Sequence, residues 1–401
     1  MNPLFQNPYR PGAGHPPPYL AGREPEIRDF ERLLQQTRIL ENMILTGLRG
    51  VGKTVLLDTL KPIAIRYGWG WIGTDMSESS SVSEEKMAMR LLTDFSVVTA
   101  GLVAPTGKRE PGFLGRAQQR SLNYEALLTL HHTIPGLPSD KLKGVLEAVW
   151  TALSPKPKGF IFAYDEAQNL SDHASNEEYP LSLLLEVFQS LQKKGFPFML
   201  ILTGLPTLFP KLVEARTFSE RMFHIVTLNR LAEGDSRDAI LKPVEAAGCP
   251  IQFTEESVQT VIEASAGYPY FIQFICREVY DVFIQMIEDG AKPSVPIDSI
   301  IRKLDEDFFA GRWARVSDRQ RDMLWVVAQV RAKDFEFTVQ EISDLSHQLL
   351  EKPFSPSHTN QMLSALCDKG LIFKNRHGKY SFAVPLLGDF ILRQRPAVTS
   401  P

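Results

Sequence analysis

Residues 47–54 read Gly-Leu-Arg-Gly-Val-Gly-Lys-Thr, the pattern G-x-x-x-x-G-K-T of a phosphate-binding loop. Before the loop, the apolar run 43–45 is typical of a buried strand, and after it Val55 to Leu57 open a helical pattern. In this context the glycines let backbone N–H groups turn inward toward a phosphate, and the helix adds the positive end of its dipole. The alternative is a glycine-rich turn that matches by accident. The strand–loop–helix order favours a site for a nucleoside triphosphate.

The residues of this loop have separate expected roles. Lys53 is expected to reach the β- and γ-phosphates, and the Thr54 hydroxyl is expected to bind Mg²⁺. The predicted nucleotide contacts of the loop are Gly47, Leu48, Arg49, Gly50, Val51, Gly52, Lys53, Thr54 and Val55. Because such a loop contacts phosphates and not bases, it does not by itself distinguish ATP from GTP.

Two further apolar runs end in polar residues. Residues 159–164 are followed by Asp165 and Glu166, and residues 198–202 are followed by Thr203. Strands buried on both faces of a parallel sheet have this pattern, and ligands bind at their carboxyl ends. Asp165 is then a predicted Mg²⁺ ligand, and Glu166 is predicted to polarise the attacking water. Thr203 is a candidate for contact with the γ-phosphate or that water. The alternatives are acidic turn residues and a hydroxyl that caps a turn.

Length and composition exclude several classes of protein. At 401 residues the chain is long for one core, so about two or three domains are expected. The net charge of −3 excludes a globally basic nucleic-acid binder. The 3 cysteines have neither metal-ligand spacing nor a disulfide framework, which fits a reducing cytoplasm. No apolar run is long enough to span a bilayer and the N-terminus lacks a signal pattern, so we expect a cytoplasmic protein without membrane contact.

Three segments around the predicted strands differ in character. Residues 1–20 are rich in proline, which excludes helix and predicts an extended arm, with a disordered tail as the alternative. Residues 101–140 contain clustered Gly, Pro and Lys, which predicts a surface loop available to a partner. Residues 232–310 show apolar spacing near that of a helix throughout, which predicts a small helical lid.

Residues 312–395 have the pattern of a winged-helix domain. This piece carries 13 Lys and Arg against 9 Asp and Glu, a net charge of +4, which leaves −7 on the rest of the chain. Two predicted helices precede a third one, which starts at the capping residue Ser355 and stops at Gly370. A predicted hairpin follows the third helix. In a DNA-binding version the third helix would enter the major groove and the hairpin would contact phosphates.

The candidate DNA contacts are polar and basic residues of the third helix and the hairpin: His358, Asn360, Gln361, Lys374, Arg376 and Lys379. The third helix has no arginine or lysine before Lys369, which is weak support for tight DNA binding. The alternative is a domain that docks a partner protein.

Two arginines in the stretch 215–223 are candidates for a role across a subunit interface. An arginine supplied by a neighbouring subunit can stabilise the charge of a transition state. Arg221 and Arg216 are the candidates for this role, and surface salt bridges are the alternative.

Taken together, these stretches resemble the AAA+/STAND P-loop ATPases, in the branch of the origin-recognition (ORC/Cdc-like) initiator ATPases. The resemblance covers nearly the whole chain, and the matching segments occur in the expected order: 7–12, 22–24, 47–54, 164–168, 203–206, 218–221, 267–270 and the C-terminal winged helix.

The resemblance implies binding of ATP, dependence on Mg²⁺ and a homo-oligomer or lid that responds to the nucleotide. It also implies that adenine lies near Arg23 and the N-terminal arm, and that Tyr268 and Pro269 of the lid contact the nucleotide. There is one departure: initiator-type members often carry a lid arginine where this chain has Tyr268, Pro269 and Tyr270. The departure favours a relative with a task other than origin loading.

The expected fold is α/β, with a P-loop NTPase parallel-sheet core of the AAA+ type. The domains are expected to be an extended arm (1–20), the ATPase core (21–231), an all-α lid (232–310) and a winged-helix domain (312–395).

The expected function is a Mg²⁺-dependent ATPase switch whose winged helix binds duplex DNA. The predicted catalytic residues are Glu166, Lys53, Thr203 and Arg221. One alternative is a signalling or scaffold ATPase whose winged helix docks a partner protein. Another is a nucleotide-binding protein that hardly hydrolyses, although Lys53 and Glu166 are both present.

Overall fold

The structure, a computed structural model, divides the chain into two units. The described residues are 6–12, 14–101, 103–105, 119–153, 155–249, 253–289, 295–330, 336–376 and 378–395. One unit, here called the sheet unit, consists of Glu24–Thr46 and Leu56–Thr227. The other, here called the lid unit, consists of Met1–Arg23, Gly47–Val55 and Leu228–Pro401. By its contacts the phosphate-binding loop therefore belongs with the N-terminal arm and the C-terminal half of the chain.

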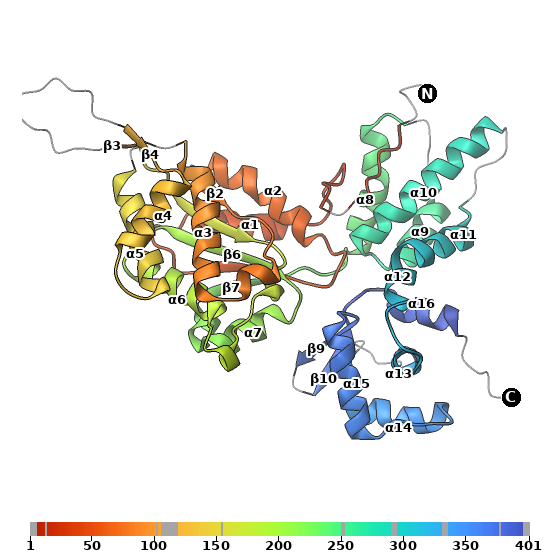
Figure 1. The fold of residues 1–401 in the computed structure, drawn as a ribbon. Helices are drawn as coiled ribbons and strands as arrows, with labels where there is room; N and C mark the ends of the chain where they lie inside the picture. The colour runs from red at the N-terminus through yellow and green to blue at the C-terminus, as the bar shows by residue number, and fades with distance from the viewer. Residues whose placement is uncertain are drawn as a thin grey trace, which may run out of the picture. The chain divides into compact units, whose positions relative to one another are not determined.

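The sheet unit is built on a five-stranded parallel sheet in the order β2-β5-β6-β1-β7 (Figure 1). Its strands are β1 (Asn42–Thr46), β2 (Trp69–Ile72), β5 (Gly159–Tyr164), β6 (Phe198–Gly204) and β7 (Phe223–Thr227). Every residue of β1, β5 and β6 is buried, as expected for central strands covered on both faces. The predicted parallel-sheet core is confirmed, and the sheet has one strand, β7, that the sequence pattern did not indicate.

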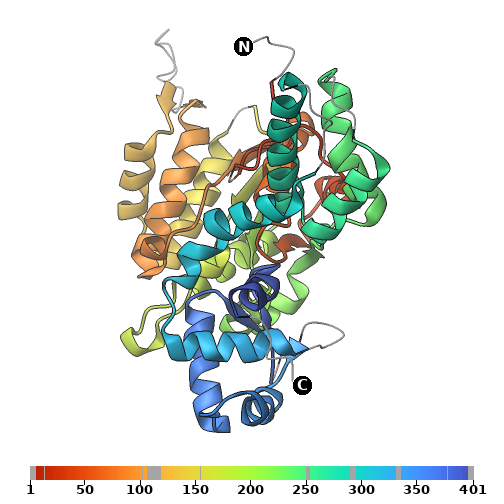
Figure 2. The same ribbon diagram turned by 90° about the vertical axis from the view of Figure 1, so that its right-hand side faces the viewer.

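Helices cover the sheet. They are α1 (Glu24–Leu34), α2 (Lys53–Arg66), α3 (Glu84–Thr99), α4 (Tyr124–Thr133), α5 (Pro138–Ala152), α6 (Pro180–Lys193) and α7 (Leu208–Ala215). Helices α3, α4 and α5 lie side by side in both views (Figures 1 and 2). The ring of Phe95 on α3 packs edge-on against Phe160 of β5 at 5.3 Å between centroids. Aromatic rings thus fill the space between α3 and the sheet.

The prediction of a surface loop over residues 101–140 is wrong in part. The segment contains a short hairpin of β3 (Val103–Pro105) and β4 (Gln119–Ser121), followed by α4 and the start of α5. The Asn123 side chain caps α4 by accepting a hydrogen bond from the N–H of Ala126 at 3.0 Å, and Leu127 is fully buried. Residues 106–118 of the predicted loop lie outside the described residues.

The first part of the lid unit is helical, as predicted. Its helices are α8 (Glu233–Ala246), α9 (Glu255–Ser265), α10 (Pro269–Glu288), α11 (Ile297–Leu304) and α12 (Ala310–Trp313), with the π-helical turn η6 (Asp305–Phe309) before α12. Helix α10 packs against α8, α9 and α11 (Figure 1). Within the described residues, no helix is both long and apolar enough to cross a membrane.

The C-terminal domain (residues 318–395) contains four helices and a small antiparallel sheet. The elements are α13 (Asp318–Gln329), β8 (Glu336–Phe337), α14 (Val339–Leu349), α15 (Pro356–Asp368), β9 (Ile372–Arg376), β10 (Lys379–Phe382) and α16 (Leu387–Gln394). The strands pair in the order β8-β10-β9. Ser355 caps α15 as expected, accepting a hydrogen bond from the N–H of His358 at 3.3 Å. Strand β8 and helix α16 were not predicted.

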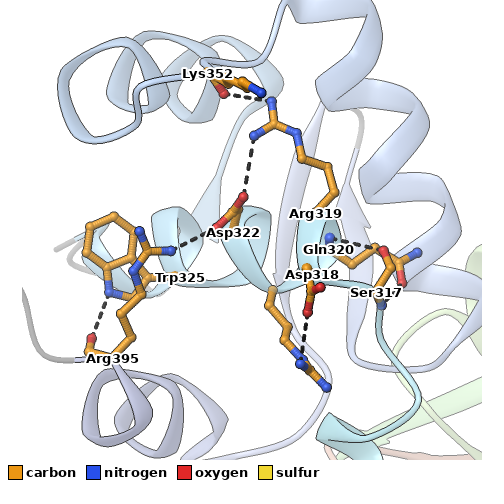
Figure 3. A network of polar contacts seen from close by, with 9 residues as sticks. Ser317, Asp318, Arg319, Gln320, Asp322, Trp325, Lys352 and Arg395 are labelled. Carbon is orange, nitrogen blue, oxygen red and sulfur yellow. Dashed lines mark hydrogen bonds and ion pairs between the residues drawn. The ribbon is translucent and has the colours of Figure 1, made fainter.

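A network of ion pairs holds the C-terminal domain together (Figure 3). Asp322 of α13 lies 3.5 Å from Arg319 and 2.8 Å from Arg395, measured between carboxylate and guanidinium atoms. The indole N–H of Trp325 donates to the backbone carbonyl of Arg395 at 2.8 Å, and the Arg395 guanidinium lies over the same indole. These contacts fix the end of α16 against α13.

Candidate functional site

The phosphate-binding loop takes a conformation that only glycine adopts easily. Gly50 and Gly52 have φ of 80° and 92°, in the left-handed region, where a Cβ is strained. Helix α2 starts at Lys53, so the N–H groups of its first turn lie at the end of the loop. The Lys53 ammonium donates to the carbonyl oxygens of Gly47 and Leu48, each at 3.0 Å. The lysine is therefore folded back over the loop that is expected to surround a phosphate.

A buried arginine forms a hydrogen bond to the backbone of the phosphate-binding loop. The side chain of Arg23 is 5% exposed, and its Nη2 atom donates to the carbonyl oxygens of Val51 at 3.0 Å and Asn229 at 2.9 Å. The guanidinium thus fixes the loop to the segment that follows β7. The predicted contact of Arg23 with adenine stays a prediction, and the observed contacts give it a positioning role.

The start of helix α10 contacts the same loop. The N–H of Tyr270 donates to the carbonyl oxygen of Gly50 at 3.2 Å, and Pro269 is the first residue of α10. Burial raises the pKa of the Tyr268 phenol, and the nearby charge of Arg230 acts in the opposite direction. The hydrogen bond to the loop comes from Tyr270, and the contact of Tyr268 and Pro269 with the nucleotide stays a prediction.

The N-terminal arm is ordered over residues 6–12 against the helical lid. Tyr9 is 3% exposed, and its hydroxyl donates to the backbone carbonyl of Ile240. Asn7 donates to the carbonyl oxygen of Arg277 at 2.9 Å. Farther along, a Cβ on Gly14 would lie 3.6 Å from the Thr54 methyl group. The arm is therefore docked on α8 and α10 and then passes beside the first turn of α2.

In the sheet unit, the carboxylate after β5 is buried and held in place. Asp165 is 4% exposed. Its Oδ1 atom accepts a hydrogen bond from the N–H of Glu166 at 2.7 Å and another from the Thr203 hydroxyl. Thr203 is fully buried, so its hydroxyl positions Asp165 and does not cap a turn. The strand ends of β5 and β6 thus meet as the parallel sheet predicts.

Glu166 is exposed and has an unusual backbone. Its φ of 51° lies in the left-handed region, which is rare for a residue with a Cβ and is found most often at functional sites. Its carboxylate accepts a hydrogen bond from the amide of Gln168. Lys211 donates to the backbone carbonyl of Gln168 at 2.8 Å, which fixes this turn to α7. The sequence indicated Glu166 but not the two residues that orient it.

A further carboxylate on α2 was missed by the sequence interpretation. Burial raises the pKa of the Asp58 carboxyl, Lys61 lowers it, and the negative charges of Asp165 and Asp75 raise it further. Asp75 pairs with Asp165 in an isolated parallel bridge after β2. Negative charge is thus concentrated at this edge of the sheet, where a cation would be stabilised. In the sequence, Asp58 is one polar residue of a helical pattern, and nothing in that pattern distinguishes it as a site residue.

The two candidate arginines lie on the 3-10 turn between α7 and β7. Arg216 is half-buried and donates to the backbone carbonyl of Ala215 at 3.2 Å. Arg221 is exposed and forms no ion pair within the described part of the chain. Arg221 is therefore the more available of the two.

The candidate DNA contacts in the C-terminal domain differ in their availability. His358, Gln361 and Lys374 are exposed. Asn360 is exposed too, but its side-chain oxygen accepts a hydrogen bond from the Tyr380 hydroxyl at 3.3 Å. The Lys379 ammonium lies 3.9 Å from the carboxylate of Glu341.

The remaining candidate, Arg376, is the last residue of β9, and its side chain lies outside the described part. Two of the six candidates are thus already engaged within the domain. A surface that reads DNA bases would be expected to leave its polar groups free.

Two family models match the sequence. Residues 19–201 match the model described as the AAA ATPase domain. Residues 306–391, which cover most of the C-terminal domain, match a model described as a domain of unknown function, DUF8462. Among curated proteins, an uncharacterized HTH-type transcriptional regulator of Methanocaldococcus jannaschii is 22% identical over 386 residues, which cover 94% of this chain and 88% of the relative.

Solved structures show the same fold. A Walker-type ATPase of Pyrococcus abyssi superposes with a TM-score of 0.58 at 17% identity, covering 93% of this chain and 96% of the other. The ADP form of the Aeropyrum pernix ORC2 protein superposes with a TM-score of 0.52 at 12% identity, covering 96% of this chain and 97% of the other. At these identities the likeness concerns the fold.

Proposed function

Because residues 19–201 match the model described as the AAA ATPase domain, we propose that this protein is a switch that binds and hydrolyses ATP. The observation that carries the proposal is the phosphate-binding loop. Its glycines have positive φ, and its carbonyl groups at Gly50 and Val51 are held by Tyr270 and Arg23. A loop fixed on both sides keeps its N–H groups directed at a phosphate without a cost in ordering.

In this proposal each site residue has one role. Lys53 binds the β- and γ-phosphates, and Glu166 orients the attacking water and takes its proton. Thr203 positions Asp165 through the hydrogen bond to its carboxylate. Arg221, exposed on its turn, stabilises transition-state charge on a neighbouring copy, which requires a homo-oligomer.

The donor chemistry also fits Mg²⁺. Thr54 offers a hydroxyl and Asp165 a carboxylate, which are hard oxygen ligands. In the described ranges, no group of three or more His, Cys, Asp and Glu side chains would hold a metal alone. Mg²⁺ bound through few protein ligands takes its remaining ligands from phosphate and water, and when bound it neutralises phosphate charge.

The test is ATP turnover across protein concentrations, with binding measured in parallel. We expect Lys53→Ala to lose ATP binding, and Glu166→Gln to bind ATP but turn over about 100-fold more slowly.

For the arginines, Arg221→Ala is compared with Arg216→Ala. Turnover of the wild type should rise with concentration, and Arg221→Ala alone should abolish that rise. If Glu166→Gln turned over ATP at the wild-type rate, Glu166 would not be the base.

For the C-terminal domain, we propose duplex DNA as the partner, supported by the +4 charge of residues 312–395 and by the name of the archaeal relative. Lys374→Glu should weaken DNA binding and reduce the dependence of log affinity on log salt by about one. Lys352→Glu, an exposed lysine of the same domain outside the candidate surface, is the matched control. Equal DNA affinities for the two variants would count against this partner.

A second candidate function is a switch whose C-terminal domain docks a protein. The favouring observation is the engagement of Asn360 by Tyr380 and of Lys379 by Glu341, which leaves few free donors for bases. This alternative predicts ATP turnover indifferent to duplex DNA at low salt. It also predicts a partner that is lost when residues 312–401 are removed.

A further inference from the structure

The lid unit contains a cavity of about 590 Å³ with an unusual concentration of positive charge. Four cationic side chains line it, together with two carboxylates, an excess of two positive charges: Arg49, Arg312, Arg315, Lys369, Asp307 and Asp368. The chain as a whole has a net charge of −3, so composition does not explain this excess. The cavity is lined by residues of the phosphate-binding loop, of the turn η6 and helix α12, and of the C-terminal end of α15 with the residues that follow it.

The arginines of the cavity lack the partners that arginines usually have. Within the described residues, no carboxylate forms an ion pair with Arg49, Arg312 or Arg315, although two carboxylates line the same cavity. The Arg312 guanidinium lies 4.4 Å from the ring centroid of Phe308 and donates to that residue's carbonyl oxygen at 2.5 Å. These contacts position the guanidinium, and neither of them is an ion pair.

Lys369 is held by neutral groups. Its ammonium donates to the backbone carbonyl of Arg315 and to the side-chain oxygen of Gln320, each at 2.7 Å. Both acceptors are uncharged, so the lysine keeps its full positive charge next to the arginines. Arg49 reaches the same place, since a Cβ on Gly370 would lie 3.3 Å from its Nη2 atom.

The positive charges of the cavity lie close enough to change the pKa of one of them. Burial lowers the pKa of the Arg312 guanidinium, and the charges of Arg49 and Arg315 lower it further, against a raising effect of Tyr270. An excess of like charges in one cavity destabilises the arrangement. A bound anion would remove that cost, and guanidinium groups present paired donors that match the oxygens of phosphate.

We propose that this cavity binds a small phosphorylated organic molecule. The excess of two positive charges matches a phosphate group, which is close to a dianion at neutral pH. The volume lies in the range of small-molecule sites and exceeds what one phosphate needs, and Phe308 and Leu371 provide an apolar wall for the organic part. The proposal goes beyond ATP hydrolysis and does not depend on it.

The experiment must separate the cavity from the phosphate-binding loop, because both would bind phosphates. Inorganic pyrophosphate is the probe, and titration calorimetry is done on the full chain carrying Lys53→Ala. Into this background we introduce either Arg315→Gln or the control Arg302→Gln. Arg302 is an exposed arginine of α11 that does not line the cavity, and Arg315 is exposed too, so neither change opens the core.

We expect the Lys53→Ala protein to bind pyrophosphate, the added Arg315→Gln to weaken binding about tenfold or more, and the added Arg302→Gln to leave it unchanged. Equal affinities for the two double variants, or no binding at millimolar pyrophosphate, would overturn the proposal. Far-ultraviolet circular dichroism checks that both variants are folded.

A competition arm distinguishes the source of the phosphate. A short duplex DNA is added to the Lys53→Ala protein before the titration with pyrophosphate. Unchanged pyrophosphate affinity supports a small-molecule site. Displacement of pyrophosphate by the duplex would overturn that assignment and give the cavity to the backbone of a nucleic acid.

Discussion

Two sets of arginines in the lid unit differ in their partners. In the C-terminal domain, Arg319 and Arg395 face Asp322 (Figure 3). Arg393 forms two hydrogen bonds to Asp305 of the π-helical turn, at 2.9 and 2.5 Å. In the cavity, Arg49, Arg312 and Arg315 form no ion pair within the described residues, although two carboxylates line the same cavity. Arginines of the same unit thus occur both with and without an ion-pair partner.

The difference helps to distinguish arginines that stabilise the fold from arginines that are available to bind a ligand. A paired arginine stabilises the fold, and its removal leaves a carboxylate without a partner. An unpaired arginine among like charges costs stability, which a fold tolerates where a ligand supplies the missing charge. The two sets should therefore respond to substitution in opposite ways.

The largest effect is expected for the Asp305–Arg393 pair. Asp305 is 8% exposed, so Asp305→Ala leaves a guanidinium without its partner in a partly buried place. We expect the free energy of local opening of α16 and η6 to fall by about 2 kcal/mol, since one partner is partly solvated. Hydrogen exchange followed by mass spectrometry measures it. Glu306→Ala, an exposed neighbour in the same turn, is the control, and an equal loss there would contradict the prediction.

A smaller effect is expected for the network of Figure 3. Asp322→Asn removes the negative charge that faces Arg319 and Arg395. Because the side chains of this network are about a third to a half exposed, the loss should be about 1 kcal/mol and should shrink at high salt. The exchange of α13 amides reports it, with Glu351→Gln as the exposed control. No change at low salt would mean that the network contributes nothing.

The smallest effect is expected for the unpaired set. Arg315→Gln removes a like charge and breaks no ion pair, so the stability of the free protein should stay within about 0.5 kcal/mol or rise slightly. Denaturant unfolding checks this, with Arg302→Gln beside it. A destabilisation as large as that of Asp322→Asn would show that Arg315 is structural and would remove the contrast between the two sets.

The fold could be predicted from the sequence where burial leaves a strong pattern. The central strands β1, β5 and β6 are continuous apolar runs, and the predicted ranges hold. Strand β7 reads Phe-His-Ile-Val-Thr and is only partly buried at the edge of the sheet, so its pattern is weak. Helix α16 spans 8 residues, too few for a reliable period of 3.6.

The site could be predicted only as far as local motifs reach. The glycines, Lys53 and the carboxylates after β5 are local features, and the sequence indicates them. The contacts that hold the loop, from Arg23 to Val51 and from Tyr270 to Gly50, join residues far apart in the chain. Arg49 and Arg312 meet only in the folded lid unit, so no spacing rule indicates their cavity.

The braces of the phosphate-binding loop also have a consequence for protein synthesis. The loop leaves the ribosome early, but Asn229, which shares Arg23 with the loop, and Tyr270 are translated much later. At roughly 5–20 residues per second, the nascent loop waits on the order of ten seconds or more for Tyr270. The strands of the sheet, complete at Thr227, can pair before that time. During translation all strands of the sheet can therefore be present before the residues that hold the phosphate-binding loop have been made.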